Sequence, residues 1–147
     1  MKFSSRAIYG LRAMLALARR HGEGPTLLKD LAEAEGLPGT YLEQLMVPLR
    51  KGGIVQAVRG ARGGYTLARE PADLPVLAIL EALEGPLVLA DCPTGSGCCG
   101  RGGACALQEL WDEGGRALGA IYGAISLAAL LERQNRKDAH PVINYAI

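Results

Sequence analysis

The sequence has few aromatic residues, no long apolar run and only two histidines. Aromatic side chains make up 5% of the 147 residues within a hydrophobic fraction of 49%, so a core must be built mainly from Leu, Ala, Val and Ile. No run of about 18 apolar residues is present, so we expect no membrane-spanning helix. The N-terminus has no unbroken apolar stretch, because Arg12 interrupts it. We therefore expect no signal peptide and a cytoplasmic protein.

Motifs of common catalytic sites are also missing. His21 and His140 fall in an expected linker and an expected tail, and nothing resembles a nucleophilic cysteine–histidine dyad. The glycine-rich stretch 59–64 is not followed by Gly-Lys-Ser or Gly-Lys-Thr, which makes it a poor phosphate-binding loop. These absences predict that the protein is not an enzyme.

The net charge of +1 hides an uneven distribution. Residues 1–70 carry eleven Lys and Arg against six Asp and Glu, a balance of +5. Residues 71–147 carry five against nine, a balance of −4. A basic half joined to an acidic half indicates that the first half binds a polyanion, although a merely solvated surface would give the same pattern.

Apolar periodicity predicts a winged helix-turn-helix domain in residues 1–70. Three helices followed by two strands are expected: 5–20, 27–35, 41–51, 54–58 and 65–67. Thr26 and Thr40 are the expected N-caps of the second and third helices, and Pro48 should kink the third helix or end it early. The turn 59–64 joins the strands into a hairpin, which is a wing when it follows a helix-turn-helix. The fold class is therefore mainly α with a small β-wing.

The second half predicts a connecting helix and a long helical arm. The expected parts are a connecting helix and linker over 71–91, a cysteine-rich loop over 92–105, dimerisation helices over 106–136 and a tail over 137–147. Within the arm, Gly114-Gly115 is an expected weak point, and Ser126 caps a last short helix ending at Glu132.

The arm carries a large apolar face. Its members are Leu107, Leu110, Trp111, Leu118, Ile121, Tyr122 and Ile125. Outside a compact winged helix such a face has little of its own chain to pack on, so we expect a symmetric homodimer. Packing against the first helix of the same chain is the alternative.

All four cysteines lie in the cysteine segment, residues 92–105. They are Cys92, Cys98, Cys99 and Cys105, and five glycines accompany them. A segment so rich in glycine costs much backbone entropy to order unless something ties it down. Paired Cys-x-x-Cys ligands of a zinc site are absent, and the wider spacing suits an iron–sulfur cluster better. Free thiols, or two disulfides formed on oxidation, are the alternative.

The third expected helix exposes polar side chains on the side away from its apolar stripe. These candidates for DNA contact are Thr40, Tyr41, Glu43, Gln44, Arg50 and Lys51. The N-terminal part of such a helix reads base edges in the major groove, where Gln pairs with adenine and Glu accepts from cytosine, while Arg and Lys suit phosphates. In the expected wing, Arg59 and Arg62 suit the negative potential of a minor groove.

Together these motifs resemble the Rrf-type winged-helix transcriptional regulators, and in particular their IscR/NsrR-like iron–sulfur members. The resemblance covers roughly residues 1–135 and is carried by Tyr41-Leu-Glu-Gln-Leu45, Leu49-Arg-Lys-Gly52, Val58-Arg-Gly60 and Gly63-Gly-Tyr65. It implies a homodimer that binds palindromic promoter DNA, with Glu43 and Gln44 facing bases and Arg59 in the minor groove. It also implies an iron–sulfur cluster held by the cysteine segment.

The implied cluster site departs from the family pattern at two positions. Cys99 is an additional thiol, so Cys92/Cys98/Cys105 and Cys92/Cys99/Cys105 are both possible ligand sets. Gln108 stands where the IscR branch has a histidine ligand. The candidates for a fourth ligand are Cys99, Asp91, Glu109 and a group from the partner subunit. We favour a [2Fe–2S] over a [4Fe–4S] cluster.

The resemblance and the residues together predict a transcriptional regulator, most simply a repressor. An iron–sulfur cluster that senses iron or sulfur status, redox state or nitric oxide would control its promoter binding. Two alternatives stay open. One is a metal-free regulator switched by thiols and disulfides, and the other is a cluster-bearing electron carrier, which would not need the wing arginines.

Overall fold

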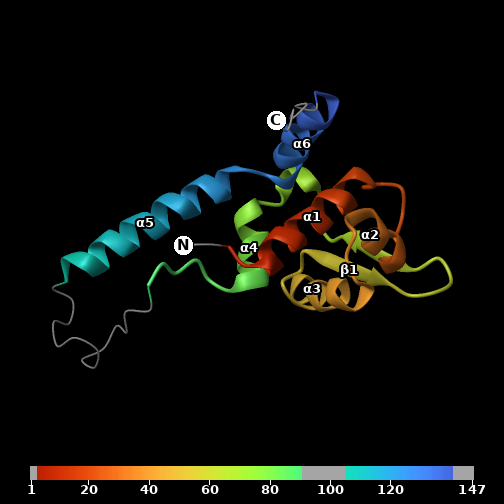
Figure 1. The fold of residues 1–147 in the computed structure, drawn as a ribbon, viewed down its shortest axis with the longest axis horizontal. Helices are drawn as coiled ribbons and strands as arrows, with labels where there is room; N and C mark the ends of the chain where they lie inside the picture. The colour runs from red at the N-terminus through yellow and green to blue at the C-terminus, as the bar shows by residue number, and fades with distance from the viewer. Residues whose placement is uncertain (1–2, 91–104, 141–147) are drawn as a thin grey trace, which may run out of the picture.

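The computed structural model describes residues 3–90 and 105–140 (Figure 1). The elements in order are α1 (Ser5–Arg19), α2 (Leu28–Glu35), α3 (Gly39–Lys51), β1 (Val55–Val58), β2 (Gly64–Leu67), the 3-10 turn η1 (Pro71–Asp73), α4 (Val76–Glu84), α5 (Ala106–Ala124) and α6 (Leu127–Ala139). The predicted fold class, mainly α with a two-stranded wing, is confirmed. Cys92, Cys98 and Cys99 lie outside the described residues.

One apolar core holds the helix-turn-helix, the wing and α4 together. Ser4 is the N-cap of α1, and its hydroxyl accepts a hydrogen bond from the Arg6 N–H. Its apolar face meets those of α2, α3 and α4, and the largest fully buried side chains are Met14, Leu31, Leu42, Leu45, Met46, Leu49, Ile54, Leu74 and Ile79. Four of these belong to α3 and fix which side of that helix faces outward.

The predicted caps of α2 and α3 are wrong. α2 begins after Leu27 and α3 after Pro38, and neither residue makes a side-chain cap bond. Thr26 is buried and pairs with Tyr65 through two backbone hydrogen bonds of 2.9 and 2.8 Å, so it belongs to the wing. Of the two effects expected of Pro48, a kink or an early end, the early end does not occur, because the helix continues to Lys51 as its predicted range had it. A proline this close to the C-terminal end removes only one helical hydrogen bond.

The wing is a short antiparallel hairpin that extends to the right in Figure 1. Val55 pairs with Leu67, and Val58 with Gly64. The backbone of Thr26 lies against the other side of β2, so close that a Cβ at Gly64 would lie 2.2 Å from the Thr26 carbonyl oxygen. Gly64 also has a φ of +145°, which L side chains rarely adopt. Both observations explain why the residue is glycine.

α5 leaves the body of the molecule, whereas α6 returns to it (Figure 1). The junction between them is tied to the start of α4, since the Val76 N–H donates to the Ile125 carbonyl at 2.9 Å and the Leu127 N–H to the Leu74 carbonyl at 2.8 Å. Ser126 caps α6, as predicted, by accepting from the Ala129 N–H.

α6 is longer than predicted and packs against α1. It runs to Ala139 instead of ending at Glu132. At its far end Asp138 forms an ion pair with Arg19 of α1 at 2.5 Å. Hydrogen bonds from Gln134 and from Arg19 hold the pKa of Asp138 below its ordinary value. The C-terminal half of the arm thus packs within its own chain, whereas α5 contacts α4 without burying a side chain among the described residues.

α5 is one continuous helix of 19 residues with no buried side chain. The helix continues through Gly114-Gly115, the expected weak point, without a break. These glycines make room for the linker that follows α4, because a Cβ at Gly114 would lie 2.8 Å from Leu89 Cδ1. The linker therefore runs alongside the helix on its way to the cysteine segment.

Candidate nucleic-acid interface and cysteine site

The outward side of α3 is polar and uncovered. Thr40, Glu43, Gln44, Arg50 and Lys51 are all exposed. Within residues 3–90 and 105–140, none of these five side chains forms an ion pair or a hydrogen bond with another side chain. They are therefore available to a ligand, which is what a recognition helix requires.

Tyr41 differs from the other predicted DNA contacts because it packs within the chain. Its ring is half-buried and lies edge-on to Tyr9 of α1, with 6.1 Å between ring centres. Its hydroxyl donates to Ser5 Oγ at 3.5 Å, and the Arg12 guanidinium lies 5.6 Å from the centre of the Tyr9 ring. This contact fixes the first turn of α3 against α1.

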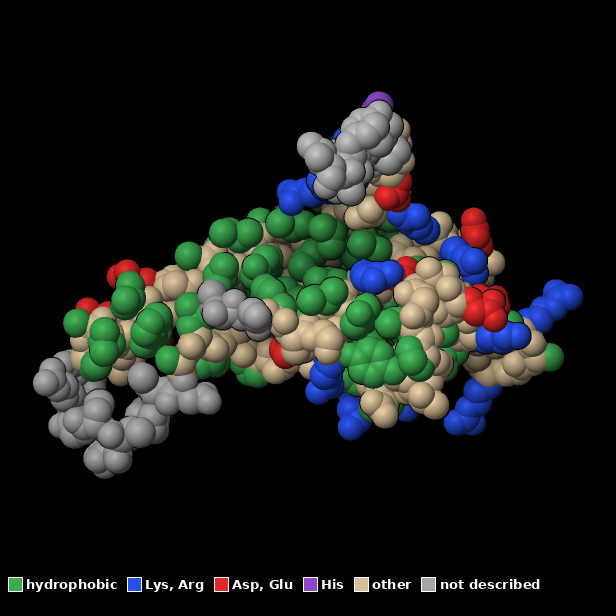
Figure 2. Space-filling model, in the orientation of Figure 1, with side chains coloured by type: hydrophobic (Ala, Val, Ile, Leu, Met, Phe, Trp, Pro, Cys, Tyr) green, Lys and Arg blue, Asp and Glu red, His purple; other side chains and the backbone are tan. Residues whose placement is uncertain are grey.

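The wing turn presents its two arginines to solvent. Arg59 and Arg62 are both exposed, and the turn between them is closed by a 2.9 Å hydrogen bond from the Gly63 N–H to the Gly60 carbonyl. A Cβ at Gly63 would lie 2.3 Å from the Val58 carbonyl oxygen, so the turn can be this narrow only with glycine there. Figure 2 shows Lys and Arg side chains along the lower and right-hand edges of the molecule, near α3 and the wing. Part of the basic charge of residues 1–70 is therefore displayed beside the exposed face of α3.

Sequence reasoning missed one exposed residue of α3. Val47 is apolar, is 42% exposed and lies between Gln44 and Lys51 on the outward side. Helical periodicity could have found it, because positions 43, 44, 47, 50 and 51 share one face.

Cys105 is the one cysteine within the described ranges. It is the N-cap of α5, has a half-buried free thiol, and accepts hydrogen bonds from the Gln108 and Glu109 N–H groups with its carbonyl oxygen. No group of three or more His, Cys, Asp or Glu side chains comes together within these ranges. A metal site in this chain therefore depends on the cysteines of the undescribed stretch.

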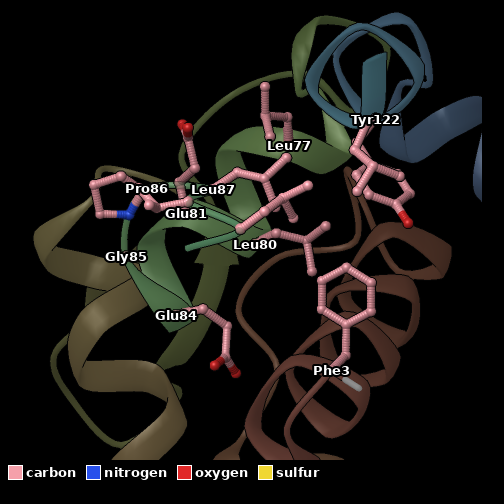
Figure 3. A pocket seen from close by; sticks show the side chains of 12 residues that line it. Phe3, Leu77, Leu80, Glu81, Glu84, Gly85, Pro86, Leu87 and Tyr122 are labelled. Atoms are coloured by element: carbon pink, nitrogen blue, oxygen red, sulfur yellow. The ribbon is translucent and has the colours of Figure 1, made fainter. Parts of the chain in front are cut away.

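The linker and α5 line an apolar cavity. It has a volume of about 340 Å³ and lies between α4, the linker 85–89, α5 and the N-terminus. Figure 3 shows Leu77, Leu80 and Leu87 gathered at its centre, with Phe3 and Tyr122 on one side. The two aromatic rings meet edge-on with 5.8 Å between their centres.

Beyond this cavity the apolar face of α5 is open to solvent. Leu107 and Ile121 are 61% and 54% exposed, and Leu110 and Trp111 are exposed as well. Figure 2 shows apolar side chains over α5 and onto the adjoining body. Contiguous apolar surface of this kind is typical of a protein–protein interface. Within the described ranges, no helix combines the length and the apolar character that crossing a membrane requires.

Comparison with known proteins identifies the family. Residues 3–133 match the Rrf2 family, described as iron-dependent transcriptional regulators. The chain belongs to the Rrf2 family. This Rrf2 protein is 49% identical over 87 residues to the HTH-type transcriptional regulator CymR of Bacillus subtilis, which covers 59% of this chain and 63% of that protein. It is 36% identical over 138 residues to the HTH-type transcriptional regulator IscR of Xenorhabdus nematophila, which covers 94% of this chain and 84% of that one.

A solved structure gives the same result. The structure of T. potens IscR is 37% identical to this Rrf2 protein and superposes with a TM-score of 0.73, covering 99% of this chain and 95% of that one. The predicted resemblance is confirmed, and so are the expectations of a transcriptional regulator and of a protein that is not an enzyme. An electron carrier has no support among these relatives.

Proposed function

We propose that this Rrf2 protein binds palindromic promoter DNA as a homodimer, and that an iron–sulfur cluster on the cysteine segment controls the binding. The observation that carries the proposal is the position of the cysteine segment between the linker and α5. The segment joins a linker packed along α5 to Cys105, the N-cap of α5, and α5 is a long helix with no buried side chain. A ligand held there acts on the helix best suited to join two copies.

The dimer is proposed from the exposure of α5. An apolar stripe with Leu107 and Ile121 more than half exposed gains free energy when a second copy covers it. A symmetric pair covers both stripes at once, because in a two-fold dimer the same patch meets itself. Two recognition helices then face a two-fold symmetric DNA site, which is why we expect a palindrome.

DNA recognition is proposed for the exposed face of α3 and for the wing. Glu43 and Gln44 are uncovered and would meet base edges, and Arg59 would enter the adjacent minor groove. Thr40, Arg50, Lys51 and Arg62 lie beside them and suit phosphates. Tyr41 would act mainly by holding the first turn of α3 against α1.

The residues of the cysteine segment fit a cluster. Cys105 offers a half-buried thiol at a helix N-terminus, where the aligned peptide dipoles stabilise a negatively charged sulfur ligand. Cys92 and either Cys98 or Cys99 would complete three thiolates, with Cys99, Asp91, Glu109 or a partner group as the fourth ligand. When bound, an iron–sulfur cluster, most simply [2Fe–2S], supplies reversible redox chemistry and reacts with oxidants or nitric oxide. Ligation through Cys105 would hold the first turn of α5 and, with it, the spacing of the two recognition helices.

The test combines spectroscopy with DNA binding. The wild-type protein and the Cys92→Ala/Cys105→Ala double variant are purified without air, and their visible absorbance and their iron and sulfide contents are measured. We expect visible absorbance and bound iron and sulfide in the wild type alone, and a promoter affinity that differs between the two. Equal spectra and equal affinities would contradict the proposal.

A thiol switch is the second candidate, favoured by the free thiol of Cys105 and by the likeness to CymR over 87 residues. It predicts no iron or sulfide in the anaerobic protein, together with a DNA affinity that changes on oxidation and returns with a reducing agent. The same preparation therefore separates the two mechanisms.

A further inference from the structure

One of the outward-facing positions of α3 is held by an apolar side chain. At 100° per residue, Val47 lies roughly 150° around the helix from the centre of the buried stripe formed by Leu42, Leu45, Met46 and Leu49. The predicted base readers Glu43 and Gln44 lie one turn before it on the same face, and Arg50 and Lys51 lie one turn after it.

Nothing in the described part of the chain gives Val47 a packing role. It is 42% exposed, whereas the next residue toward the core, Met46, is 0% exposed. A single exposed valine is ordinary on a protein surface. Val47, however, lies at the centre of a face whose other members are polar or charged, and we propose that this face lies against DNA bases. A polar group of a base that faced Val47 would be left without a hydrogen-bond partner.

The major groove offers one apolar group, the C5-methyl of thymine, and apolar side chains contact it. On the basis of the proposed DNA binding, we propose that Val47 is a specificity-determining residue that packs on a thymine methyl group in each half-site. Val47 follows Glu43 and Gln44 by one turn of about 5.4 Å. Its thymine therefore lies about one or two base-pair steps of 3.4 Å from the bases those residues face.

The test removes the methyl group and nothing else. The full-length protein, purified without air, selects its preferred duplex from a random pool. Each thymine of that duplex is then replaced by deoxyuridine, one symmetric pair at a time, and affinities are measured at one salt concentration. For one pair we expect the wild type to lose roughly fourfold in affinity per half-site, the effect of burying one methyl group.

The matched variants locate the contact. In Val47→Ser the ratio of thymine to deoxyuridine affinity at that pair should fall to about one, whereas Val47→Thr, which keeps one methyl group, should retain part of it. Gln44→Ala should weaken binding overall and leave the ratio unchanged. Both positions are exposed, so equal melting temperatures of the three variants check that folding is unaffected.

Three outcomes would count against the proposal. A Val47→Ser variant that keeps the full ratio assigns the methyl group to another residue. A wild type for which no thymine methyl matters removes the contact altogether. A protein that selects no preferred duplex overturns the proposed DNA recognition, and with it this inference, so the two failures are distinguishable.

Discussion

Gly64 shows how much of the wing depends on a missing side chain. Its α-carbon faces the backbone of Thr26, and the two flanking hydrogen bonds, Thr26 N–H to Tyr65 and Tyr65 N–H to Thr26, are 2.9 and 2.8 Å long. These bonds attach the segment before α2 to β2. The wing therefore packs against the helix-turn-helix and is not a free hairpin. This packing holds Arg59 and Arg62 at a fixed place relative to α3.

We expect Gly64→Ala to destabilise the protein by about 2–4 kcal/mol, because the new Cβ meets a backbone carbonyl and φ becomes strained. Thermal unfolding followed by circular dichroism measures the loss. Gly39→Ala is the matched control, because a Cβ there has open space and no positive φ is involved, so its stability should change little. If Gly64→Ala melts like Gly39→Ala, the wing does not pack on Thr26 as described.

At the residue scale the sequence predicted the helix caps only in part. Ser126 caps α6 as expected, and of the two serines able to cap α1, Ser4 and Ser5, it is Ser4 that does so. Thr26 has a capping side chain too, but its backbone is used by Tyr65, and this pairing between distant segments leaves no local signal. Pattern reasoning that considers neighbours along the chain cannot detect such a contact.

The apolar side chains of α5 would suit a buried helix, yet the helix lies largely exposed. It has the apolar face of a buried helix and no buried residue. A helix with such a stripe is stable in water chiefly when the stripe is packed. Within the described ranges, α4, the linker near Gly114 and Gly115, and Phe3 cover only part of the stripe, so most of it is open to a partner.

We expect Ile121→Glu to weaken the dimer at least a hundredfold, because a carboxylate would be buried in an apolar interface without a partner. Sedimentation or light scattering across a concentration series measures the shift toward monomer. Helix content should stay nearly unchanged, since Ile121 is 54% exposed within its own chain.

Glu113→Gln is the control for that variant, being an exposed polar position on the same helix. It should leave the dimer intact. A dimer of Ile121→Glu as tight as that of the control would mean that α5 is not the interface.

Apolar periodicity predicted helix type and position well, and helix ends less well. α1, α3 and α4 lie where their stripes placed them. α6 continues past Glu132 through a polar run, where no apolar pattern marks a helix. Its continuation is accompanied by the ion pair between Asp138 and Arg19, residues 119 positions apart.

For the molecule as a whole, charge is divided between two ends of the chain. The balance is +5 over residues 1–70 and −4 over residues 71–147. α3 and the wing belong to the basic part, so attraction to phosphates acts on the surface that we propose reads the bases. Repulsion between the acidic part and the DNA phosphates would orient the molecule with its acidic part away from DNA.

We expect Arg59→Ala to weaken promoter binding and to reduce the slope of log affinity against log salt by about one for each chain of the dimer. Arg136→Ala on α6 should change neither quantity, because it lies in the acidic half. Affinities measured over a series of salt concentrations give both slopes. Equal slopes for the two variants would show that Arg59 contacts no phosphate or minor groove.

The candidate site could be predicted only in part. Polar side chains on α3 and the wing arginines followed from periodicity and turn chemistry, whereas Val47 was overlooked because only polar residues of that face were considered as candidates for DNA contact. The packing of Tyr41 on Tyr9 depends on how α1 and α3 cross, which residue spacing within one helix does not determine.

Because α5 is held at its C-terminal end, a displacement of its other end would rotate the whole helix about the held end. Its C-terminal end is held by hydrogen bonds between the Leu74–Val76 and Ile125–Leu127 backbones, and its other end begins at Cys105. Nineteen residues span about 28 Å. A tilt of roughly 7° about the held end thus moves the far end by one base-pair step of about 3.4 Å. Conversely, a displacement of a few ångströms at the Cys105 end would rotate α5 by only a few degrees about its held end.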